Sequence, residues 1–422
     1  MRRLAVLSLH TSPLAQPGTG DGGGMNVYVR EMSTALARAG VECDVYTRAW
    51  SAGLPATVTV EPGFRVHHVP AGPLGRMVKE DLSSVVDEFA DAVAELMVSG
   101  AGLDHDADGD LRGFDAVHAN YWLSGIAGHQ IKHRLDLPLV STFHTLARVK
   151  AQASPEEVSC DEPHRRASAE ASVIRCSDIL LASCTVEAEQ LVDLYGADSE
   201  RIRVIAPGVD HAFFGPGYRR QARRAIGVPL EGPLLLFVGR IQPLKNADVA
   251  VQALAAMKSH PDARLLVVGG PSGPDGDASL QQLVALIDTL GLADRVHLLP
   301  PQPHELLSTF YRAADVCLVP SRSESFGLVA LESAACGTPV VAAAVGGLTT
   351  IVDDGRTGYL VDDPTPEAFA SAVGRILDDQ LLAERLGVAA VIRSRRYTWA
   401  QAAEGLRNTY EELAASRLVQ CS

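Results

Sequence analysis

Short apolar runs of strand-like composition alternate with longer segments of helical period along most of this chain of 422 residues. Such alternation is typical of a parallel sheet with helices on both faces, because parallel strands need long crossover connections. The strand-like runs form two series: Arg3–Leu9, Cys43–Thr47, Phe64–Val69, Ala116–Asn120, Leu139–Phe143, Ile179–Ser183 and Ile202–Ile205, then Leu234–Val238, Leu265–Val268, Val296–Leu299, Val316–Val319, Pro339–Ala343 and Gly358–Val361. The sequence therefore predicts an α/β protein with two doubly wound, Rossmann-like domains.

Turn-forming residues separate the two series. They begin with Pro207-Gly208 and include Gly215-Pro216-Gly217. We predict an N-terminal domain over residues 1–205, a linker over 206–217 and a C-terminal domain over 218–395. A helical pattern within the last segment, 396–422, has no strand after it, so this helix either caps the second domain or crosses back to the first.

The overall composition excludes several classes of protein. The chain has 51 acidic and 37 basic residues, a net charge of −14, which argues against a nucleic-acid partner. The apolar runs, such as Pro233–Gly239, are far shorter than the ~20 residues of a membrane helix. The apolar N-terminal stretch Leu4–Leu7 is too short for a secretion signal. We expect a cytoplasmic protein without a membrane span.

The chain carries seven cysteines, which are scattered and never form a Cys-x-x-Cys pair. This pattern predicts a reduced chain without structural zinc, and no metal site is assigned. Residues 104–110 resemble a calcium loop in their spaced aspartates, but a strand-like run follows and Asp115 takes the place of the usual bidentate Glu. A solvated acidic loop is the favoured interpretation, and metal binding there stays open, as does a homodimer.

A glycine-rich segment lies before the first helical pattern, Met25–Ala39. Gly18, Gly20 and Gly23 match the dinucleotide fingerprint in spacing, but they do not follow the first strand directly, and the second strand ends in Thr47-Arg48 without the acidic residue that holds a ribose. The segment is better suited to bringing backbone N–H groups at a helix N-terminus close to an anion or a sugar.

Two cations follow the first strand of the second series. Arg240 comes directly after an apolar strand and Gly239, and Lys245 follows five residues on. Ligands of doubly wound folds bind at the carboxyl ends of the strands, so these side chains are placed to neutralise a diphosphate.

A second cluster follows the strand Val316–Val319. Glu324 lies in a loop that leads through Phe326, Gly327 and Leu328 into a helix carrying Glu332. Free N–H groups at the start of that helix can bind phosphate oxygens. The Glu332 carboxylate can accept hydrogen bonds from ribose hydroxyls, and Glu324 can reach a sugar. Together with Arg240 and Lys245, these residues predict a nucleotide-sugar site.

With this combination the chain resembles the family 4 retaining glycosyltransferases of GT-B fold over nearly its whole length. The signature is Gly-Arg…Lys with Glu-Ser-Phe-Gly-Leu-x-x-x-Glu. Within that family, four further runs are similar to the mycothiol-pathway branch that acts on inositol phosphate: residues 10–21, 23–29, 121–125 and 269–273. The resemblance implies two domains facing a cleft, and transfer of N-acetylglucosamine from UDP-N-acetylglucosamine to 1D-myo-inositol 3-phosphate.

The resemblance also assigns residues. It implies that the UDP-sugar is bound by Gly23, Gly24, Arg240, Lys245, Glu324, Phe326, Gly327, Leu328 and Glu332, and that His144 contacts the transferred sugar. It places Lys79, Tyr121, Thr145 and Arg166 at the acceptor phosphate and His10 and Asn26 in the acceptor pocket. Arg240, Lys245, Glu324 and His144 are the expected catalytic residues. The resemblance implies that no cofactor is required for the chemistry, and a divalent metal is not implied but stays open.

Departures from the branch pattern cluster on the acceptor side. They include Ala119-Asn120 before Tyr121 and Arg148 after Thr145. A paralogue with another acceptor therefore stays open, such as one similar to sucrose-phosphate synthase that uses fructose 6-phosphate. A nucleotide-sugar-binding protein without turnover is a further alternative, but the donor residues are all present.

Overall fold

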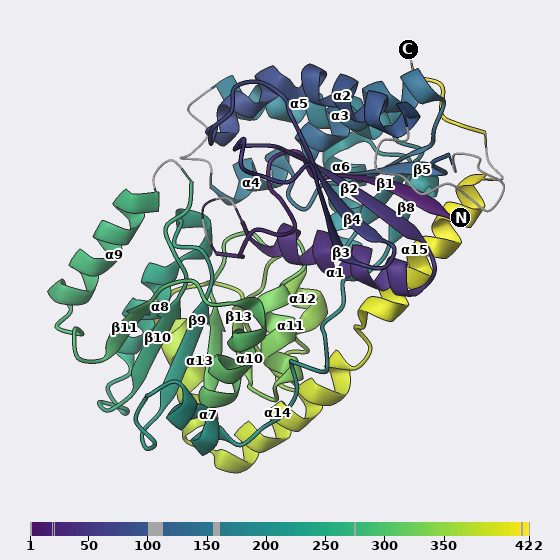
Figure 1. Ribbon diagram of the computed structural model, residues 1–422. Coiled ribbons are helices and arrows are strands. Elements are labelled where there is room, and N and C mark those ends of the chain that lie inside the picture. Colours follow the sequence, from purple (N-terminus) through teal and green to yellow (C-terminus); the bar gives the residue numbers. More distant parts are fainter. Residues whose placement is uncertain are drawn as a thin grey trace. The chain divides into compact units, whose positions relative to one another are not determined.

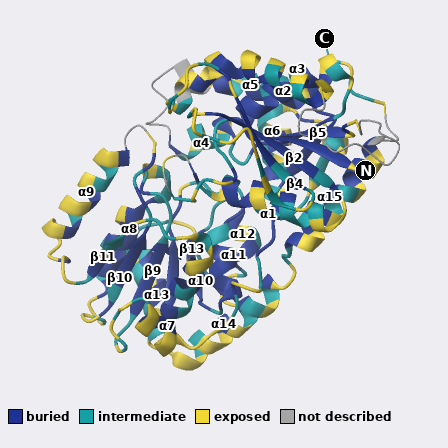
Figure 2. Cartoon of the chain, in the orientation of Figure 1, coloured by how far each residue is buried: buried dark blue, intermediate teal, exposed yellow. Residues whose placement is uncertain are grey.

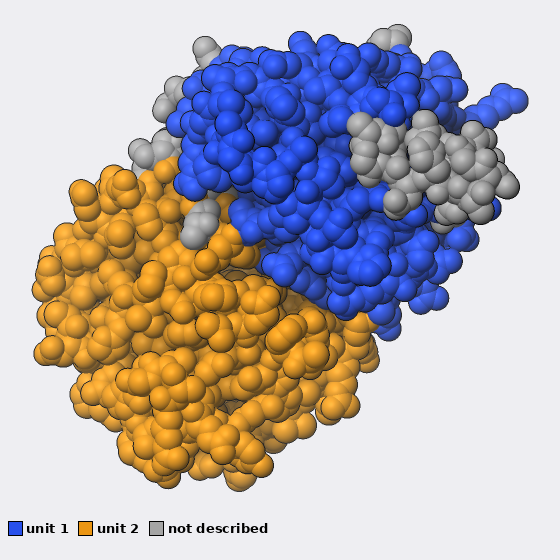
Figure 3. Space-filling model, viewed as in Figure 1, with its two compact units in different colours: residues 1–15, 25–206, 399–422 blue, residues 16–24, 207–398 orange. Residues whose placement is uncertain are grey.

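The computed structural model describes residues 2–18, 20, 22–99, 113–154, 161–273, 276–414 and 417–421. The chain divides into two compact units, shown in Figures 1 and 3. The first unit consists of residues 1–15, 25–206 and 399–422, and the second of residues 16–24 and 207–398. The acidic segment 104–110 lies outside the described residues.

The first unit is built on an eight-stranded sheet of order β3-β4-β2-β1-β5-β6-β7-β8, in which only β3 is antiparallel to its neighbour. Its elements are β1 (Arg3–Leu7), α1 (Gly24–Arg38), β2 (Glu42–Arg48), β3 (Thr57–Glu61), β4 (Phe64–Val69), the 3₁₀ helix η1 (Lys79–Val85), α2 (Val86–Ser99), β5 (Ala116–Asn120), α3 (Trp122–Leu135), β6 (Leu139–Thr142), α4 (Ala147–Ala153), α5 (Asp161–Cys176), β7 (Ile179–Ala182), α6 (Thr185–Tyr195), η3 (Ser199–Arg201), β8 (Ile202–Val204) and α15 (Trp399–Ala414).

The second unit is built on a six-stranded, all-parallel sheet of order β11-β10-β9-β12-β13-β14. Its elements are α7 (Arg219–Ala225), β9 (Leu234–Val238), η4 (Pro243–Lys245), α8 (Ala247–Ala256), β10 (Arg264–Val268), α9 (Gly276–Thr289), β11 (Val296–Leu299), α10 (His304–Ala313), β12 (Val316–Val319), α11 (Leu328–Ala335), β13 (Val340–Ala343), α12 (Leu348–Ile351), β14 (Gly358–Val361), α13 (Pro366–Leu377) and α14 (Gln380–Ser394).

The predicted fold class is confirmed, since each of the predicted strand-like runs matches a strand whose bounds agree within two residues. The sequence analysis missed β3. This edge strand pairs with β4 in an antiparallel hairpin around Pro62-Gly63, and its residues are exposed or only half-buried. A search for buried parallel strands passes over such a segment, although the alternation in Thr57–Glu61 followed by Pro-Gly is a hairpin signal.

Unit boundaries differ from the predicted ones at the N-terminal glycine-rich segment. Residues 16–24 cluster with the second unit, although they were placed in the N-terminal domain. Gln16 donates a side-chain hydrogen bond to the carbonyl of Pro301 at 3.1 Å, and a side chain at Gly18 would meet the Pro301 ring. The helix α15 belongs to the first unit, where the Tyr410 hydroxyl bonds His118 of β5 at 2.9 Å.

Each unit has its own hydrophobic core around its sheet, and central strands such as β2 and β9 appear as buried elements in Figure 2. In the first unit α2 and α5 both pack against α3 over one core cluster. In the second unit α8, α9 and α13 cover the corresponding cluster. Because parallel strands buried on both faces need apolar residues throughout, β1 and β12 are fully buried.

Cysteine usage differs from the expectation of a fully reduced chain. Cys176 at the end of α5 and Cys421 near the C-terminus form a disulfide, with their Cα atoms 5.3 Å apart. Among the described residues, Cys43, Cys184, Cys317 and Cys336 are buried and form no disulfide. No helix in the described part of the chain is long and apolar enough to cross a membrane.

Candidate functional site

The centre of the second unit's sheet is a topological switch point. From β9 the chain continues outward on one side to β10 and β11, while β12, β13 and β14 lie on the other side. Crossover helices leave such a point in opposite directions and open a crevice at the carboxyl ends of the two central strands. Arg240 and Lys245 follow β9 and Glu324 follows β12, so all three lie at this edge.

Arg240 is held by a backbone that continues the sheet beyond β9. The N–H groups of Gly239 and Ile241 donate to the carbonyls of Val268 and Gly270 at 3.0 and 2.8 Å. The Arg240 guanidinium donates to the Ser272 hydroxyl at 3.2 Å. A Cβ at Gly23 would lie 3.4 Å from Arg240 Nε, so the glycine-rich segment approaches this guanidinium closely without a side chain.

Lys245 and Glu324 form an ion pair at 2.5 Å, and both side chains are about a fifth exposed. The loops that carry them are joined by Asn246, a buried residue at φ 51° that sequence reasoning did not assign. Its amide nitrogen donates to the carbonyl of Pro320 at 3.0 Å, and its oxygen accepts from Arg322 Nε at 2.9 Å. Asn tolerates the left-handed conformation better than most residues, which is a signal that sequence analysis could have used.

The turn before α11 packs against a loop with two successive glycines, Gly346 and Gly347. A Cβ at Gly346 would lie 2.0 Å from the carbonyl oxygen of Glu324, and one at Gly347 would lie 2.3 Å from Phe326 Cα. Gly347 N–H also donates to the Glu324 carbonyl at 2.9 Å. This contact fixes the residues 326–328 at the N-terminus of α11, where main-chain N–H groups and the helix dipole favour an anion.

Glu332 is buried within α11, and the protein itself contacts both of its carboxylate oxygens. His304 contacts Oε1 at 2.7 Å, and the Tyr311 hydroxyl donates to Oε2 at 2.8 Å. Burial and the Glu332 charge raise the pKa of Tyr311 well above its usual value, so this hydroxyl stays a donor. Neither partner was predicted, because nothing in the sequence relates α10 to α11. A ribose bound by Glu332 has to share its oxygens with these side chains.

The first unit has a switch point of its own, between β1 and β5. The chain goes from β1 to β2 on one side, and β5, β6 and β7 lie on the other. His10 follows β1, Tyr121 follows β5 and Thr145 follows β6, so three of the predicted acceptor residues come from the carboxyl ends of adjacent strands.

Tyr121 is the centre of this second cluster. It is buried and has φ 76°, a strained value for a residue other than glycine. Lys79 Nζ lies 4.6 Å from the centroid of its ring, Arg166 Cζ lies 4.9 Å from it, and the His10 ring centroid is 4.5 Å away. The fold thus brings Lys79 and Arg166 together, although they are far apart in the sequence.

Arg166 is oriented by a hydrogen-bonded network on α5. Its Nε donates to Glu170 at 2.7 Å, and a terminal nitrogen donates to the carbonyl and hydroxyl oxygens of Thr145 at 2.7 and 3.0 Å. Burial opposes the charge of Arg166, but Tyr121 and the Glu170 carboxylate together raise its pKa above the ordinary value. Arg166 is therefore cationic near pH 7.

Glu170 itself was not predicted. It is fully buried and accepts from Ala147 N–H at 2.9 Å and from the Tyr195 hydroxyl. Arg148, one of the residues that depart from the branch pattern, lies over the Tyr195 ring, with its Cζ 4.6 Å from the centroid. This departure therefore adjoins the network that orients Arg166.

Asn26 and His144 are the remaining predicted residues of this unit. The Asn26 amide donates to the Thr11 hydroxyl and the Ser12 carbonyl, both at 2.6 Å, and so holds the segment after β1. His144, at φ 60°, donates from Nε2 to the Asn120 side-chain oxygen at 2.8 Å. Burial and the neighbouring His118 lower the pKa of His144 to about 3, so its imidazole is neutral near pH 7.

The predicted residues thus form two clusters, one in each unit. The second unit carries the residues assigned to the nucleotide sugar, Gly23, Gly24, Arg240, Lys245, Glu324, Phe326, Gly327, Leu328 and Glu332, and the first carries His10, Asn26, Lys79, Tyr121, His144, Thr145 and Arg166.

Two doubly wound units with cations at the carboxyl edges of their sheets are features of the GT-B glycosyltransferases. The Glycosyl transferases group 1 profile matches residues 219–392, and the profile of the Glycosyl transferase 4-like domain matches residues 23–208. The chain belongs to the family 4 glycosyltransferases of GT-B fold, and it is a glycosyltransferase enzyme of the mycothiol type.

Two curated relatives that match nearly the whole chain share one name. D-inositol 3-phosphate glycosyltransferase of Acidothermus cellulolyticus is 47% identical over 99% of this chain and 91% of its own. The protein of that name from Xylanimonas cellulosilytica is 47% identical over 98% of both chains.

Among solved structures, sucrose-phosphate synthase from Thermosynechococcus elongatus superposes with a TM-score of 0.89 at 33% identity, covering 99% of this chain and 100% of that one. Anabaena HepE in complex with UDP-glucose shares the fold, with a TM-score of 0.73 at 20% identity over 98% of this chain and 100% of that one.

Proposed function

We propose that this protein transfers N-acetylglucosamine from UDP-N-acetylglucosamine to 1D-myo-inositol 3-phosphate with retention of configuration. The observation that carries the acceptor assignment is the convergence of Lys79 and Arg166 on Tyr121, because two cations beside a hydroxyl suit a phosphate dianion. The shared name of relatives 47% identical over nearly the full length supports the same substrate pair.

The second unit supplies the donor chemistry in this proposal. Negative charge develops on the leaving diphosphate as the bond to the sugar breaks. Arg240, Lys245 and the N–H groups at the start of α11 would stabilise that charge in the transition state more than in the ground state. Glu332 would hold the ribose and Glu324 the sugar. Positive charge from side chains then takes the part that a metal ion plays in other enzymes.

We infer retention of configuration from the family resemblance. In this family the acceptor hydroxyl attacks the anomeric carbon from the face that the diphosphate leaves. A phosphate oxygen of the donor would accept the acceptor's proton. No side chain is then needed as a general base. A neutral His144 fits this scheme, because with a pKa of about 3 it hydrogen-bonds a sugar hydroxyl rather than acting as an acid near pH 7.

The same proposal assigns a role to each part of the chain. Residues 1–205 would bind the acceptor and 218–395 the nucleotide sugar, apart from Gly23 and Gly24, which cluster with the second unit. A UDP-sugar donor also favours a cytoplasmic enzyme.

UDP release from UDP-N-acetylglucosamine tests the proposal. The reaction is run with myo-inositol 3-phosphate, with unphosphorylated myo-inositol, with fructose 6-phosphate and without acceptor, and the product is identified by mass spectrometry. Stimulation by the inositol phosphate alone, with an N-acetylglucosaminyl product, is expected. Equal rates with and without every acceptor would contradict the assignment.

Transfer to fructose 6-phosphate is the second candidate. The likeness to sucrose-phosphate synthase, at 33% identity over both whole chains, favours it. It also fits an anion site around Tyr121, so the two candidates differ in the polyol rather than in the phosphate. Stimulation by fructose 6-phosphate but not by inositol phosphate, with UDP-glucose as the better donor, would replace the first candidate by the second.

A further inference from the structure

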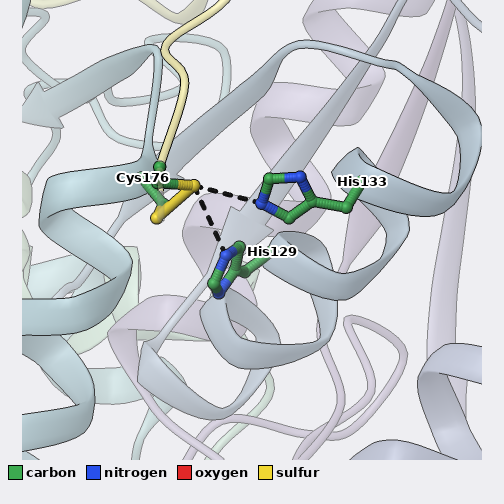
Figure 4. Close-up of side chains that lie close together, drawn as sticks. His129, His133 and Cys176 are labelled. Carbon is green, nitrogen blue, oxygen red and sulfur yellow. Dashed lines mark hydrogen bonds between the residues drawn. A yellow bond between two sulfur atoms is a disulfide. The ribbon is translucent and has the colours of Figure 1, made fainter.

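Four nitrogen and sulfur ligand atoms converge in the first unit, on residues that belong to neither cluster described above. They belong to His129 and His133 on α3, to Cys176 at the end of α5 and to Cys421 near the C-terminus. All four atoms lie within 4.8 Å of one another. Figure 4 shows both imidazoles pointing toward the sulfur pair at Cys176.

The distances in this cluster approach those of a tetrahedral zinc site. Cys421 Sγ lies 3.1 Å from Nε2 of His133 and 3.5 Å from Nε2 of His129. Bond lengths of about 2.3 Å to sulfur and about 2.0–2.1 Å to nitrogen place neighbouring ligand atoms roughly 3.3–3.8 Å apart in a tetrahedron. Small side-chain movements within the cluster are therefore enough to surround one ion.

The fold holds the four ligands in place. His129 and His133 are four residues apart on one helix, so they share a face, and their ring centroids are 4.8 Å apart. Between them in sequence, Lys132 is buried and donates to the Cys176 carbonyl at 2.9 Å and to Asp178 at 2.7 Å. The C-terminal segment is fixed through Val419, whose N–H donates to the other Asp178 oxygen at 2.6 Å.

We propose that the reduced chain binds one Zn²⁺ through His129, His133, Cys176 and Cys421. Two thiolates and two neutral imidazoles form a closed site of the structural type, with no position left for a substrate. Binding releases the two thiol protons, and the disulfide excludes the ion because it uses both sulfurs. Zinc would then fix residues 417–421 to α3 and α5.

The two histidines distinguish a zinc site from a plain disulfide. A disulfide requires only the two sulfurs, and removing an imidazole leaves it intact. A zinc ion requires the imidazoles as well. The sequence does not reveal these four ligands, because the two cysteines are 245 residues apart and form no Cys-x-x-Cys motif.

Metal analysis of the full-length chain is the test. The protein, carrying no polyhistidine tag, is purified under reducing conditions, and its zinc is measured by plasma mass spectrometry together with its free thiols. We expect about one zinc per chain, falling at least tenfold in His133→Ala and in Cys421→Ser. His297→Ala serves as the matched control because His297 is an exposed histidine of the second unit.

Thermal unfolding gives a readout that does not depend on activity. The three tryptophans, Trp50, Trp122 and Trp399, all belong to the first unit, so their fluorescence follows that unit. Removing zinc with a chelator should lower the transition temperature of the reduced wild type by several degrees and leave that of His133→Ala unchanged. Reduced wild type without zinc, or zinc that persists in both ligand variants, would overturn the proposal, as would a Cys176–Cys421 disulfide that survives the reducing purification.

Discussion

At the scale of single residues, Lys245 is the most direct test of the donor site. Lys245→Ala should lower kcat/KM by about 10²–10³-fold, as expected when one group that stabilises developing negative charge is removed. Because its ion pair with Glu324 is partly exposed, we expect the melting temperature to change by only a few degrees.

Steady-state kinetics and a thermal melt measure both effects, and Lys258→Ala, at an exposed lysine of the same unit, is the control. Transfer at near wild-type rate in Lys245→Ala would show that the donor site has been misassigned.

Arg166 tests the acceptor site in the same way. A charge-assisted hydrogen bond contributes about 1.5–3 kcal/mol, so Arg166→Ala should raise the acceptor KM by roughly 10–150-fold. The donor KM should change little, because Arg166 belongs to the cluster around Tyr121 and not to the donor cluster.

Arg165→Ala is the matched control, since Arg165 is the exposed neighbour on the same helix. Equal increases in both KM values would remove Arg166 from the acceptor site, and a loss of folded protein would be visible in the thermal melt.

Single residues also mark the limit of what the sequence could predict. Arg240, Lys245 and Glu324 follow their strands directly, and the carboxyl ends of parallel strands share one edge, so their grouping could be predicted from local pattern. The grouping of Lys79 with Arg166 could not, because it depends on how η1 and α5 place these side chains against the ring of Tyr121. Partners such as Glu170 and Tyr311 are buried groups whose role arises only in the packed structure.

At the scale of elements, the loop after β13 limits how the α11 N-terminus can be placed. A methyl group at Gly347 would lie 2.3 Å from Phe326 Cα and 2.5 Å from two carbonyl oxygens. Gly347→Ala should therefore displace the turn at residues 324–327 and raise the donor KM at least tenfold, while the acceptor KM stays within about twofold.

Gly374→Ala is a suitable comparison, because a methyl group there would meet nothing within 4 Å. Kinetics with each substrate varied separately measure the effect. An unchanged donor KM in Gly347→Ala would mean that this turn takes no part in binding the nucleotide sugar.

Elements were predictable to different degrees. Central strands such as β9 and β12 are continuous apolar runs bounded by turn residues, and hydrophobicity alone locates them within a residue or two. The edge strand β3 is half-buried and short, so its identity depends on pairing with β4. The zinc-type cluster combines a pair of histidines on one helix with two distant cysteines, and only the folded chain brings them together.

At the scale of the whole molecule, the division into units was the least predictable feature. The restart of the strand–helix rhythm indicates two domains and a linker. It gives no sign that residues 16–24 cluster with the second unit, because that assignment follows from contacts such as Gln16 with Pro301. The sequence left open whether the last helix caps the second domain or crosses back to the first. In the structure Tyr410 joins α15 to His118 in the first unit's sheet.

The stability of the first unit should depend on one buried carboxylate. Asp44 on β2 is bonded by Arg3 of β1 at 2.9 Å and by Arg65 and His67 of β4 at 2.9 and 2.8 Å, so it ties three neighbouring strands together. Burial alone would raise the pKa of Asp44, but the hydrogen bonds from His67 and Arg65 and the charge of Arg3 lower it to about 2.

The sign of the pH dependence follows from this shift. In the unfolded chain an aspartate has a pKa of about 3.9, so the unfolded state takes up a proton before the folded state does. The stabilisation by Asp44 is therefore fully present above about pH 5 and is lost progressively as the pH falls through 2, and it amounts to roughly 2–3 kcal/mol.

Urea unfolding between pH 6 and pH 2.5, followed by tryptophan fluorescence, measures the effect because all three tryptophans belong to the first unit. Asp44→Asn should be less stable than wild type at pH 6 by about 3–5 kcal/mol, because it leaves a buried arginine without its counter-ion. Its free energy of unfolding should fall less steeply than that of the wild type below pH 4. Glu42→Gln, which removes a partly exposed partner of Arg65, should keep the wild-type slope. Parallel slopes for wild type and Asp44→Asn would mean that other carboxylates control the acid stability of this unit.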